Sequence, residues 1–252
     1  MIIAKISGGL GNQMFQYASA KALAIRLHEE LYLETLTYRQ VIPYVDPRIF
    51  ELDIFPNLFP RFITQDQANG FYHTGRFKTR LKKLMGIPYK KVFTEIRHGY
   101  NEKIAEIKPP VLMDGYFQTE KYFESNDDVI RHQFRFPELL REDVNFQVLK
   151  DIRNSLSVSV HVRRGDYVKY APTHSFHGVC SEEYYKESIS YFRELNPDCF
   201  FYFFSDEPDW VARNLLQNDL KASLVKSNSD RDSWKDMYLM SQCKHNIIAN
   251  SS

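Results

Sequence analysis

Short apolar segments of strand length alternate with helix-like segments at both ends of this 252-residue chain. Residues 2–6 are rich in isoleucine and lead into two glycines, residues 13–31 contain no Pro or Gly, and the strand-like "LYLET" follows. Residues 156–162 read "LSVSVHV" and open a second series of alternating strands and helices. This alternation is typical of parallel α/β sheets, and a chain of this length forms one or two domains. We therefore predict two α/β domains, residues 1–150 and residues 151–252.

Composition excludes several classes of function. The chain has 33 Lys and Arg against 32 Asp and Glu, and its net charge of +1 argues against binding nucleic acid through bulk charge. Its three cysteines form no C-x-x-C pair, which indicates a reducing compartment and neither a disulfide scaffold nor a zinc site. No segment of the sequence reads as a signal peptide or a membrane span. We expect a soluble cytoplasmic protein whose many aromatic residues mostly form its core or, alternatively, stack on sugars.

The segment "HVRRGDY" follows a predicted strand directly, so it lies at the carboxyl end of a parallel sheet, where open α/β folds bind ligands. Arginine is permanently charged and binds phosphate through two parallel hydrogen bonds. Arg163 and Arg164 point to opposite sides of an extended chain, so one can face a ligand while the other pairs with Asp166. Gly165 allows a sharp turn or a close approach of the backbone to the ligand. A purely structural cluster of ion pairs is the alternative.

The opening turn "GGLGNQ" joins a strand to a helix, as phosphate-binding loops do, and Asn12 is the predicted N-cap of that helix. The turn departs from the dinucleotide pattern G-x-G-x-x-G, because Met14 stands at the position of the third glycine. Glu34 nevertheless lies about where a dinucleotide enzyme holds its ribose. An NAD-dependent oxidoreductase is therefore one alternative for the function.

The triplet "DRD", Asp230 to Asp232, matches an Asp-x-Asp pattern that can bind Mn²⁺ or Mg²⁺ through carboxylate oxygens. It lies in a loop rich in Ser, Asn and Asp before a predicted helix, where such residues form turns and caps. No His or Cys cluster has zinc spacing. We predict neither a metal site nor a cofactor.

The stretch Arg76–Lys91 carries seven basic residues. One face of its predicted helix is apolar and holds Phe77, Leu81, Leu84 and Met85. An ordinary surface helix is the first interpretation. The second is weak peripheral contact with an anionic membrane at the inner surface, since each Lys or Arg near such a surface contributes roughly 1 kcal/mol.

Four segments occur in an order and spacing that cover essentially the whole chain, namely "GGLGNQMFQYASAKALA", "GYFQTEKYF", "VSVHVRRGDYV" and "DMYLMSQCKHNIIANSS". Together they resemble the bacterial α-1,2-fucosyltransferases, and the first and third also resemble segments of other GDP-fucose enzymes. The resemblance implies a GT-B architecture, in which two Rossmann-like domains face one another across a cleft. Residues 1–150 are then the acceptor side and residues 151–252 bind GDP-fucose. The C-terminal domain is expected to be incomplete, because the family continues after "NSS", where this sequence ends.

The resemblance also implies an activity. A galactoside 2-α-L-fucosyltransferase moves L-fucose from GDP-β-L-fucose to the 2-hydroxyl of a galactose in a glycan, with inversion to an α linkage and without metal. A non-catalytic sugar-binding module is the second alternative, beside the oxidoreductase.

The resemblance assigns roles by motif. Arg163 or Arg164 would neutralise the β-phosphate of the leaving GDP, and Asp166 is the third catalytic candidate. The general base stays open, with Asp114 and Asp166 as candidates from their positions in the sequence. The expected donor-binding residues are Gly9, Gly11, Asn12, Gln13, His161, Asp206, Asn250, Ser251 and Ser252.

Overall fold

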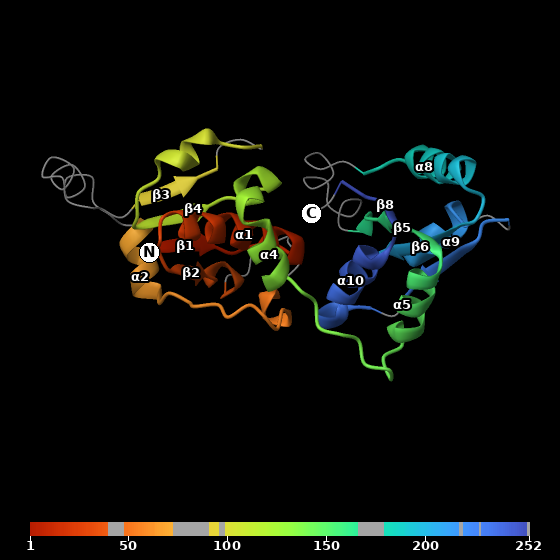
Figure 1. Cartoon of the computed structure of the whole chain (residues 1–252), viewed down its shortest axis with the longest axis horizontal. Coiled ribbons are helices and arrows are strands. Elements are labelled where there is room, and N and C mark those ends of the chain that lie inside the picture. Colours follow the sequence, from red (N-terminus) through yellow and green to blue (C-terminus); the bar gives the residue numbers. More distant parts are fainter. Residues whose placement is uncertain are drawn as a thin grey trace, which may run out of the picture. The chain divides into compact units, whose positions relative to one another are not determined.

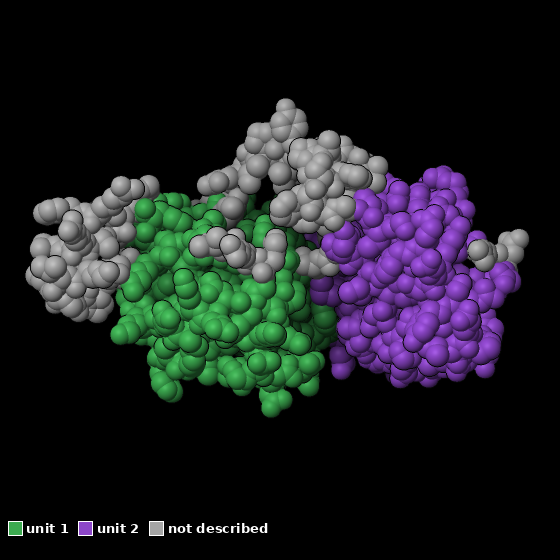
Figure 2. Space-filling view, turned by 90° about the horizontal axis from the view of Figure 1, so that it is seen from above, with its two compact units in different colours: residues 1–137, 252 green, residues 138–251 purple. Residues whose placement is uncertain are grey.

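The computed structural model describes residues 1–39, 48–72, 91–95, 99–165, 179–216, 219–226 and 228–250. The chain divides into two compact units, residues 1–137 and residues 138–251 (Figure 1, Figure 2). In the described part of each unit, the strands form a parallel four-stranded sheet. The prediction of an α/β chain with two parallel sheets is confirmed.

The sheet of the first unit has the strand order β2–β1–β4–β3. Its strands are β1 (Ile2–Lys5), β2 (Leu31–Glu34), β3 (Lys91–Thr94) and β4 (Val111–Asp114). The described helices are α1 (Leu10–Arg26), α2 (Gln65–Tyr72) and α4 (Asp127–Gln133). Short 3-10 turns are η1 (Leu36–Arg39), η2 (Leu52–Ile54), η3 (Glu102–Glu106), η4 (Glu120–Tyr122) and η5 (Glu124–Asn126). Ile3 of β1 and Leu112 of β4 form a core cluster with Ala68 and Phe71 of α2.

Helix α1 begins three residues earlier than the sequence predicts. Its N-cap is Gly9, and the predicted cap, Asn12, lies inside the helix, so that prediction is wrong. The Asn12 side chain is used elsewhere, because its Oδ1 accepts a hydrogen bond from Gln118 Nε2 at 2.6 Å. The turn before the helix contains Gly8 at φ 76°, a backbone conformation that favours glycine.

The polar sequence of residues 117–134, which has no Pro or Gly, predicts one helix, but the structure has two 3-10 turns followed by α4. The buried Tyr122 ties this segment to a neighbouring loop. Its hydroxyl accepts a hydrogen bond from Asn101 N at 2.9 Å and donates one to Gly99 O at 3.0 Å. We attribute the broken helix to these tertiary contacts, which override the local preference for a helix.

The sheet of the second unit has the order β7–β6–β5–β8. Its strands are β5 (Leu156–Val162), β6 (Cys199–Ser205), β7 (Ala222–Val225) and β8 (His245–Ile247), and the described helices are α5 (Asn145–Asn154), α8 (Glu182–Leu195), α9 (Pro208–Asn214) and α10 (Trp234–Gln242). The turn η6 (Asp230–Asp232) precedes α10. The sequence predicts Ser181, which precedes two glutamates, as the N-cap of α8, and the structure confirms it, since Ser181 Oγ accepts a hydrogen bond from Tyr184 N. In the register of the sheet, Val162 is paired with Ser205, so β5 and β6 end at the same edge.

The two units separate between Pro137 and Glu138, earlier in the chain than the predicted boundary near residue 150. Residue 150 lies within α5, whose Leu149 and Ile152 are buried. Arg153 of α5 also donates hydrogen bonds to Tyr238 and Gln242 of α10. Residues 138–150, which the sequence analysis places in the first domain, therefore belong to the second unit.

A partly buried carboxylate in α10 predicts a pH-dependent stability. Burial raises the pKa of Asp236 to about 6 from its ordinary 3.8, although Asn228 donates a hydrogen bond to it at 2.6 Å. Between about pH 4 and pH 6 the folded chain holds a proton that the unfolded chain has released, so the free energy of unfolding falls as pH rises through this window. The variant Asp236→Asn retains an acceptor oxygen but carries no charge. We expect it to raise the free energy of unfolding near pH 7 by about 1–3 kcal/mol.

Thermal unfolding of both proteins from pH 4 to pH 7 measures this effect. The control is Asp151→Asn, at an exposed position in α5. Equal pH dependence of Asp236→Asn and the unmodified chain would contradict the prediction.

The basic stretch Arg76–Lys91 lies outside the described residues except for Lys91, which begins β3. Its contact with an anionic membrane stays a prediction of the sequence.

Candidate functional site

One carboxylate connects the loop after β5 to the residues after β6. Asp206 Oδ1 accepts a hydrogen bond from Arg164 N at 3.0 Å, and its Oδ2 accepts one from Gly165 N at 2.9 Å. The same Oδ2 lies 3.3 Å from Arg163 Nε in an ion pair. The Asp206 side chain is 22% exposed, and both of its oxygens bind this loop. Asp206 therefore fixes the conformation of residues 163–165, which we call the arginine loop. Its direct contact with a nucleotide stays a prediction.

Gly165 permits this close contact. A Cβ atom at this position would stand 2.8 Å from Asp206 Oδ2, which is too short for an ordinary contact. The sequence predicts either a sharp turn at Gly165 or a close approach of its backbone to a ligand, and the structure shows a close approach to Asp206.

The two arginines are held by different partners. Arg163 pairs with Asp206, whereas the Arg164 guanidinium lies over the ring of Trp210 in α9, with Cζ 4.0 Å from the ring centroid. Two permanent positive charges thus stand at the carboxyl end of β5, as the sequence predicts. The predicted pairing with Asp166 lies outside the described residues.

His161 precedes the arginines and is half-buried near the end of β5. Burial lowers the pKa of its imidazole, the charge of Arg163 lowers it further, and Asp206 opposes the shift. A lowered pKa keeps the ring neutral at pH 7, so it can both donate and accept hydrogen bonds.

The end of β8 reaches the same edge of the sheet. Val160 of β5 is paired with Ile247 of β8, and Asn250 follows three residues later, with an exposed side chain. Ser251 and Ser252 lie outside the described residues, so their predicted contacts with the donor stay predictions.

In the first unit, Gln13 holds the glycine-rich turn in place. Its Nε2 donates hydrogen bonds to Gly8 O at 3.1 Å and Ile49 O at 2.8 Å, and its Oε1 accepts one from Glu51 N at 2.9 Å. The side chain is fully buried. Gly9 is the N-cap at the end of this glycine-rich turn, and Gly11 lies in the first turn of α1. The Tyr38 hydroxyl also donates a hydrogen bond to Gly8 O. The resemblance assigns Gln13 to the donor; the structure shows it holding the turn, and its contact with the donor stays a prediction.

Removing the Gln13 amide is expected to destabilise the first unit. Gln13→Ala leaves Ile49 O and Glu51 N without this partner and removes one of the two hydrogen bonds to Gly8 O, which costs about 2–4 kcal/mol in the free energy of unfolding. Chemical denaturation monitored by circular dichroism measures the loss. Gln65→Ala, at an exposed position in α2, is the matched control and should change stability by less than about 0.5 kcal/mol. Equal effects of the two substitutions would show that Gln13 does not support the turn.

The model of glycosyl transferase family 11 matches residues 1–252. The chain belongs to glycosyl transferase family 11. An α-1,2-colitosyltransferase from Escherichia coli is 32% identical over 263 residues, which cover 100% of this chain and 84% of that protein. The galactoside α-(1,2)-fucosyltransferase 1 of Alouatta belzebul is 25% identical over 249 residues, covering 96% of this chain and 60% of that protein. The resemblance to α-1,2-fucosyltransferases inferred from the four segments is confirmed at the level of the family.

Solved structures support the fold. POFUT1 in complex with GDP superposes with a TM-score of 0.50 at 15% identity and covers 97% of this chain and 89% of that chain. The α-1,6-fucosyltransferase NodZ, co-crystallised with GDP, also superposes with a TM-score of 0.50 at 15% identity. This match covers 97% of this chain and 86% of that chain. No described helix has the length and apolar character needed to cross a membrane.

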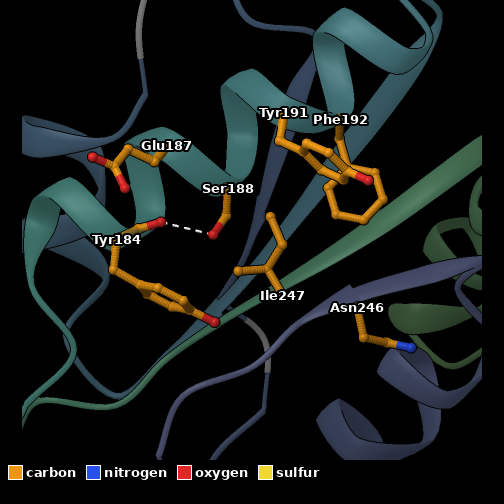
Figure 3. Close-up of a pocket in the computed structure, with 7 residues that line it drawn as sticks. All are labelled: Tyr184, Glu187, Ser188, Tyr191, Phe192, Asn246 and Ile247. Atoms are coloured by element: carbon orange, nitrogen blue, oxygen red, sulfur yellow. Dashed lines mark hydrogen bonds between the residues drawn. The ribbon is translucent and has the colours of Figure 1, made fainter.

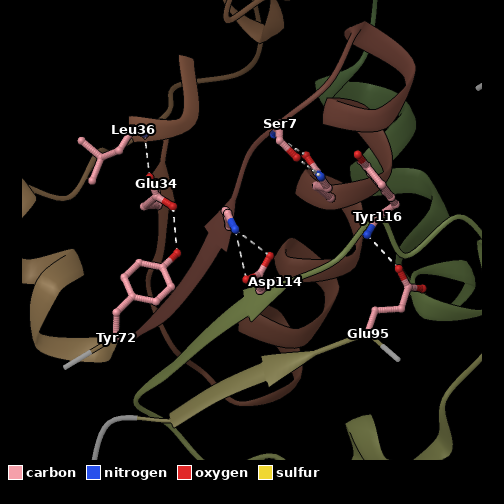
Figure 4. A network of polar contacts seen from close by, with 9 residues as sticks. Ser7, Glu34, Leu36, Tyr72, Glu95, Asp114 and Tyr116 are labelled. Carbon is pink, nitrogen blue, oxygen red and sulfur yellow. Dashed lines mark hydrogen bonds and ion pairs between the residues drawn. The ribbon is translucent and has the colours of Figure 1, made fainter. Parts of the chain in front are cut away.

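In this family 11 chain, Glu34 is not available to hold a ribose. Its side chain is buried, and its oxygens accept hydrogen bonds from Leu36 N at 2.6 Å and from the hydroxyl of Tyr72 at 3.1 Å (Figure 4). Glu34 supports the turn after β2, so the feature that favoured a dinucleotide enzyme is structural.

Other carboxylates at the same edge of the first sheet are also engaged. Asp114, a candidate base at the end of β4, forms an ion pair with Lys5 Nζ at 3.0 Å. Glu95, which follows β3, accepts a hydrogen bond from Tyr116 N at 2.8 Å (Figure 4) and another from Phe117 N at 3.0 Å. The side chains of Asp114 and Lys5 are 30% and 27% exposed, so this pair is partly accessible to solvent.

The "DRD" triplet forms the turn η6, and Asp232 is ion-paired with Lys235 at 3.1 Å. Among the described residues, no group of three or more His, Cys, Asp or Glu side chains is arranged to hold a metal ion. Asp232 therefore acts within the turn, as the loop interpretation predicts.

An open hollow of about 390 Å³ lies beside α8 and β8 in the second unit (Figure 3). It is lined by Tyr184, Glu187, Ser188, Tyr191, Phe192, Asn246 and Ile247. This lining contains one carboxylate and no Lys or Arg, so it is unsuited to a diphosphate. None of the predicted donor residues lines it.

Proposed function

We propose that this family 11 chain transfers L-fucose from GDP-β-L-fucose to the 2-hydroxyl of a galactose in a glycan, with inversion to an α-1,2 linkage. The observation that carries the proposal is the pair of guanidinium groups, Arg163 and Arg164, at the carboxyl end of β5. In this proposal the second unit binds the nucleotide, the first unit binds the glycan, and the two face one another across a cleft.

The proposed roles of the arginines follow from the negative charge that develops on the leaving diphosphate. When the bond between the anomeric carbon and the β-phosphate oxygen breaks, negative charge grows on the leaving diphosphate, and preorganised cationic donors stabilise it. Arg163 and Arg164 supply these donors, and the neutral His161 adds a hydrogen-bonding group at the same edge. The galactose 2-hydroxyl attacks from the opposite face, which inverts the configuration. Its proton passes to a base for which Asp114 and Asp166 stay the candidates.

This mechanism predicts an activity without metal. Turnover is expected to survive excess EDTA, because the arginines neutralise the diphosphate. The double substitution Asp230→Asn with Asp232→Asn is expected to change it less than about threefold, since Asp232 contributes a partly exposed ion pair. An absolute requirement for Mn²⁺ or Mg²⁺ would contradict the proposed mechanism.

The direct test combines transfer and binding. We expect the chain to form an α-1,2-fucoside from GDP-fucose and a soluble galactoside, with the linkage assigned by NMR. We also expect GDP and GDP-fucose, but not NAD, to raise the melting temperature, because a ligand that binds only the folded state stabilises it. Stabilisation by NAD alone would support the oxidoreductase, and binding of GDP-fucose without transfer would support the sugar-binding module. Either result would overturn the proposal.

A second donor is favoured by one observation. The Escherichia coli relative named as a colitosyltransferase is more similar to this chain than the Alouatta fucosyltransferase is. Colitose lacks the 3-hydroxyl of fucose, so a site that hydrogen-bonds this hydroxyl rejects colitose strongly, whereas an apolar site discriminates little. Competition between the GDP-linked forms of the two sugars, measured as a ratio of kcat/KM values, decides which is the donor.

A further inference from the structure

Trp210 links the arginine loop to the core of the second unit. It lies in α9 and packs partly buried against the core cluster that contains Val160, Phe203 and Val211. The Arg164 guanidinium lies over its ring, with Cζ 4.0 Å from the centroid. A guanidinium at this distance from an indole is attracted by the ring quadrupole.

Arg164 has an unusual set of partners. Its backbone N–H is bound by Asp206, but its Nε is buried and has no acceptor among the described residues. No described carboxylate forms an ion pair with its guanidinium, in contrast to Arg163. The stack on Trp210, and not a carboxylate, therefore orients this cation, and its charge stays available to an anion.

We propose that Trp210 is a positioning residue that orients Arg164 for the diphosphate of the donor nucleotide. This inference rests on the proposed function. Holding a long side chain in one orientation before the ligand arrives removes part of the entropic cost of binding. Trp210 supplies that restraint through its aromatic face, because it can hold the planar cation without neutralising it.

Two residues that follow β6 each hold the side chain of a different arginine. Asp206 and Trp210 lie four positions apart, and they contact Arg163 and Arg164 respectively. The register that pairs Val162 with Ser205 brings both segments to one edge of the sheet. The orientation of each arginine is set by a different residue of the same short segment.

The test is a double-mutant cycle on the affinity for GDP, measured by isothermal titration calorimetry. We expect Trp210→Leu, which retains an apolar side chain without a π face, to weaken binding about 3- to 30-fold, and Trp210→Phe to retain most of the affinity. In an Arg164→Ala background, Trp210→Leu should change the affinity less than about twofold, because the residue acts through Arg164. A purely structural role gives equal losses in both backgrounds and would overturn the inference.

The second tryptophan provides the matched control and a separate readout. Trp234 begins α10, and its ring lies 6.0 Å from Lys235 Nζ. Trp234→Leu should leave the affinity for GDP unchanged. Because the chain has only two tryptophans, Trp234→Phe makes Trp210 the sole tryptophan, and its fluorescence reports on the stack even if Trp210→Leu fails to fold.

In this single-tryptophan protein, GDP is expected to change the emission of Trp210 in a saturable way, and Arg164→Ala should abolish the change. Binding by calorimetry without any change in emission would contradict the inference alone. An unmodified chain that does not bind GDP would instead overturn the proposed function, and the inference with it.

Discussion

Replacing Arg164 by alanine is expected to lower turnover by about 100-fold or more, and Arg163→Ala to cause a loss in the same direction. Each substitution removes a cationic donor whose interaction with the leaving diphosphate is strongest in the transition state, and loss of one such donor costs about 10²–10³ in kcat. Lysine should restore little activity at either position, because an ammonium group cannot form the planar pair of hydrogen bonds. Steady-state kinetics with GDP-fucose and a soluble galactoside measures both losses.

Two controls accompany this prediction. Arg213→Ala changes an exposed arginine of α9 and should leave turnover unchanged. Melting temperatures show whether the loop variants stay folded. If Arg163→Ala and Arg164→Ala both retained nearly full activity, the assignment of the donor site to the end of β5 would be wrong.

The second large effect is expected at Asp206. Asp206→Ala removes two hydrogen bonds from backbone N–H groups and the ion pair with Arg163, so the loop loses the contacts that fix it. Hydrogen bonds to a charged group contribute about 1.5–3 kcal/mol, and we expect kcat/KM to fall by about 10- to 100-fold. Asp206→Asn should be intermediate, because an amide has one acceptor oxygen and cannot pair with Arg163.

Asp209→Asn, three residues later and exposed, is the matched control and should change kcat/KM less than about twofold. Gly165→Ala tests the role of Asp206 independently, because the added Cβ would displace the Asp206 carboxylate. We expect it to lower kcat/KM as well. A chain with Asp206→Ala that retained full kcat/KM would show that the arginines are oriented without it.

Much of the fold could be predicted from local pattern. The alternation in residues 156–162 predicts β5 with the bounds that the structure shows, and Ser181 before two glutamates predicts the start of α8. These features depend on neighbours in the sequence, since a strand has a period of two residues and an N-cap bonds the backbone three residues on. The same reasoning failed for residues 117–134, where the buried Tyr122 contacts a loop that precedes it by about twenty residues.

The sequence by itself determined the parallel α/β class, the position of two arginines after a strand and the family. Only the tertiary structure decided what each polar side chain does there. Gln13 and Glu34 lie where ligand contacts were expected, yet both are buried and hold turns. Asp206 and Trp210 could be connected to the arginines only through the register of β5 with β6. The physical reason is that strand and cap signals are local, whereas the partner of a buried polar group is set by which distant segments the sheet brings together.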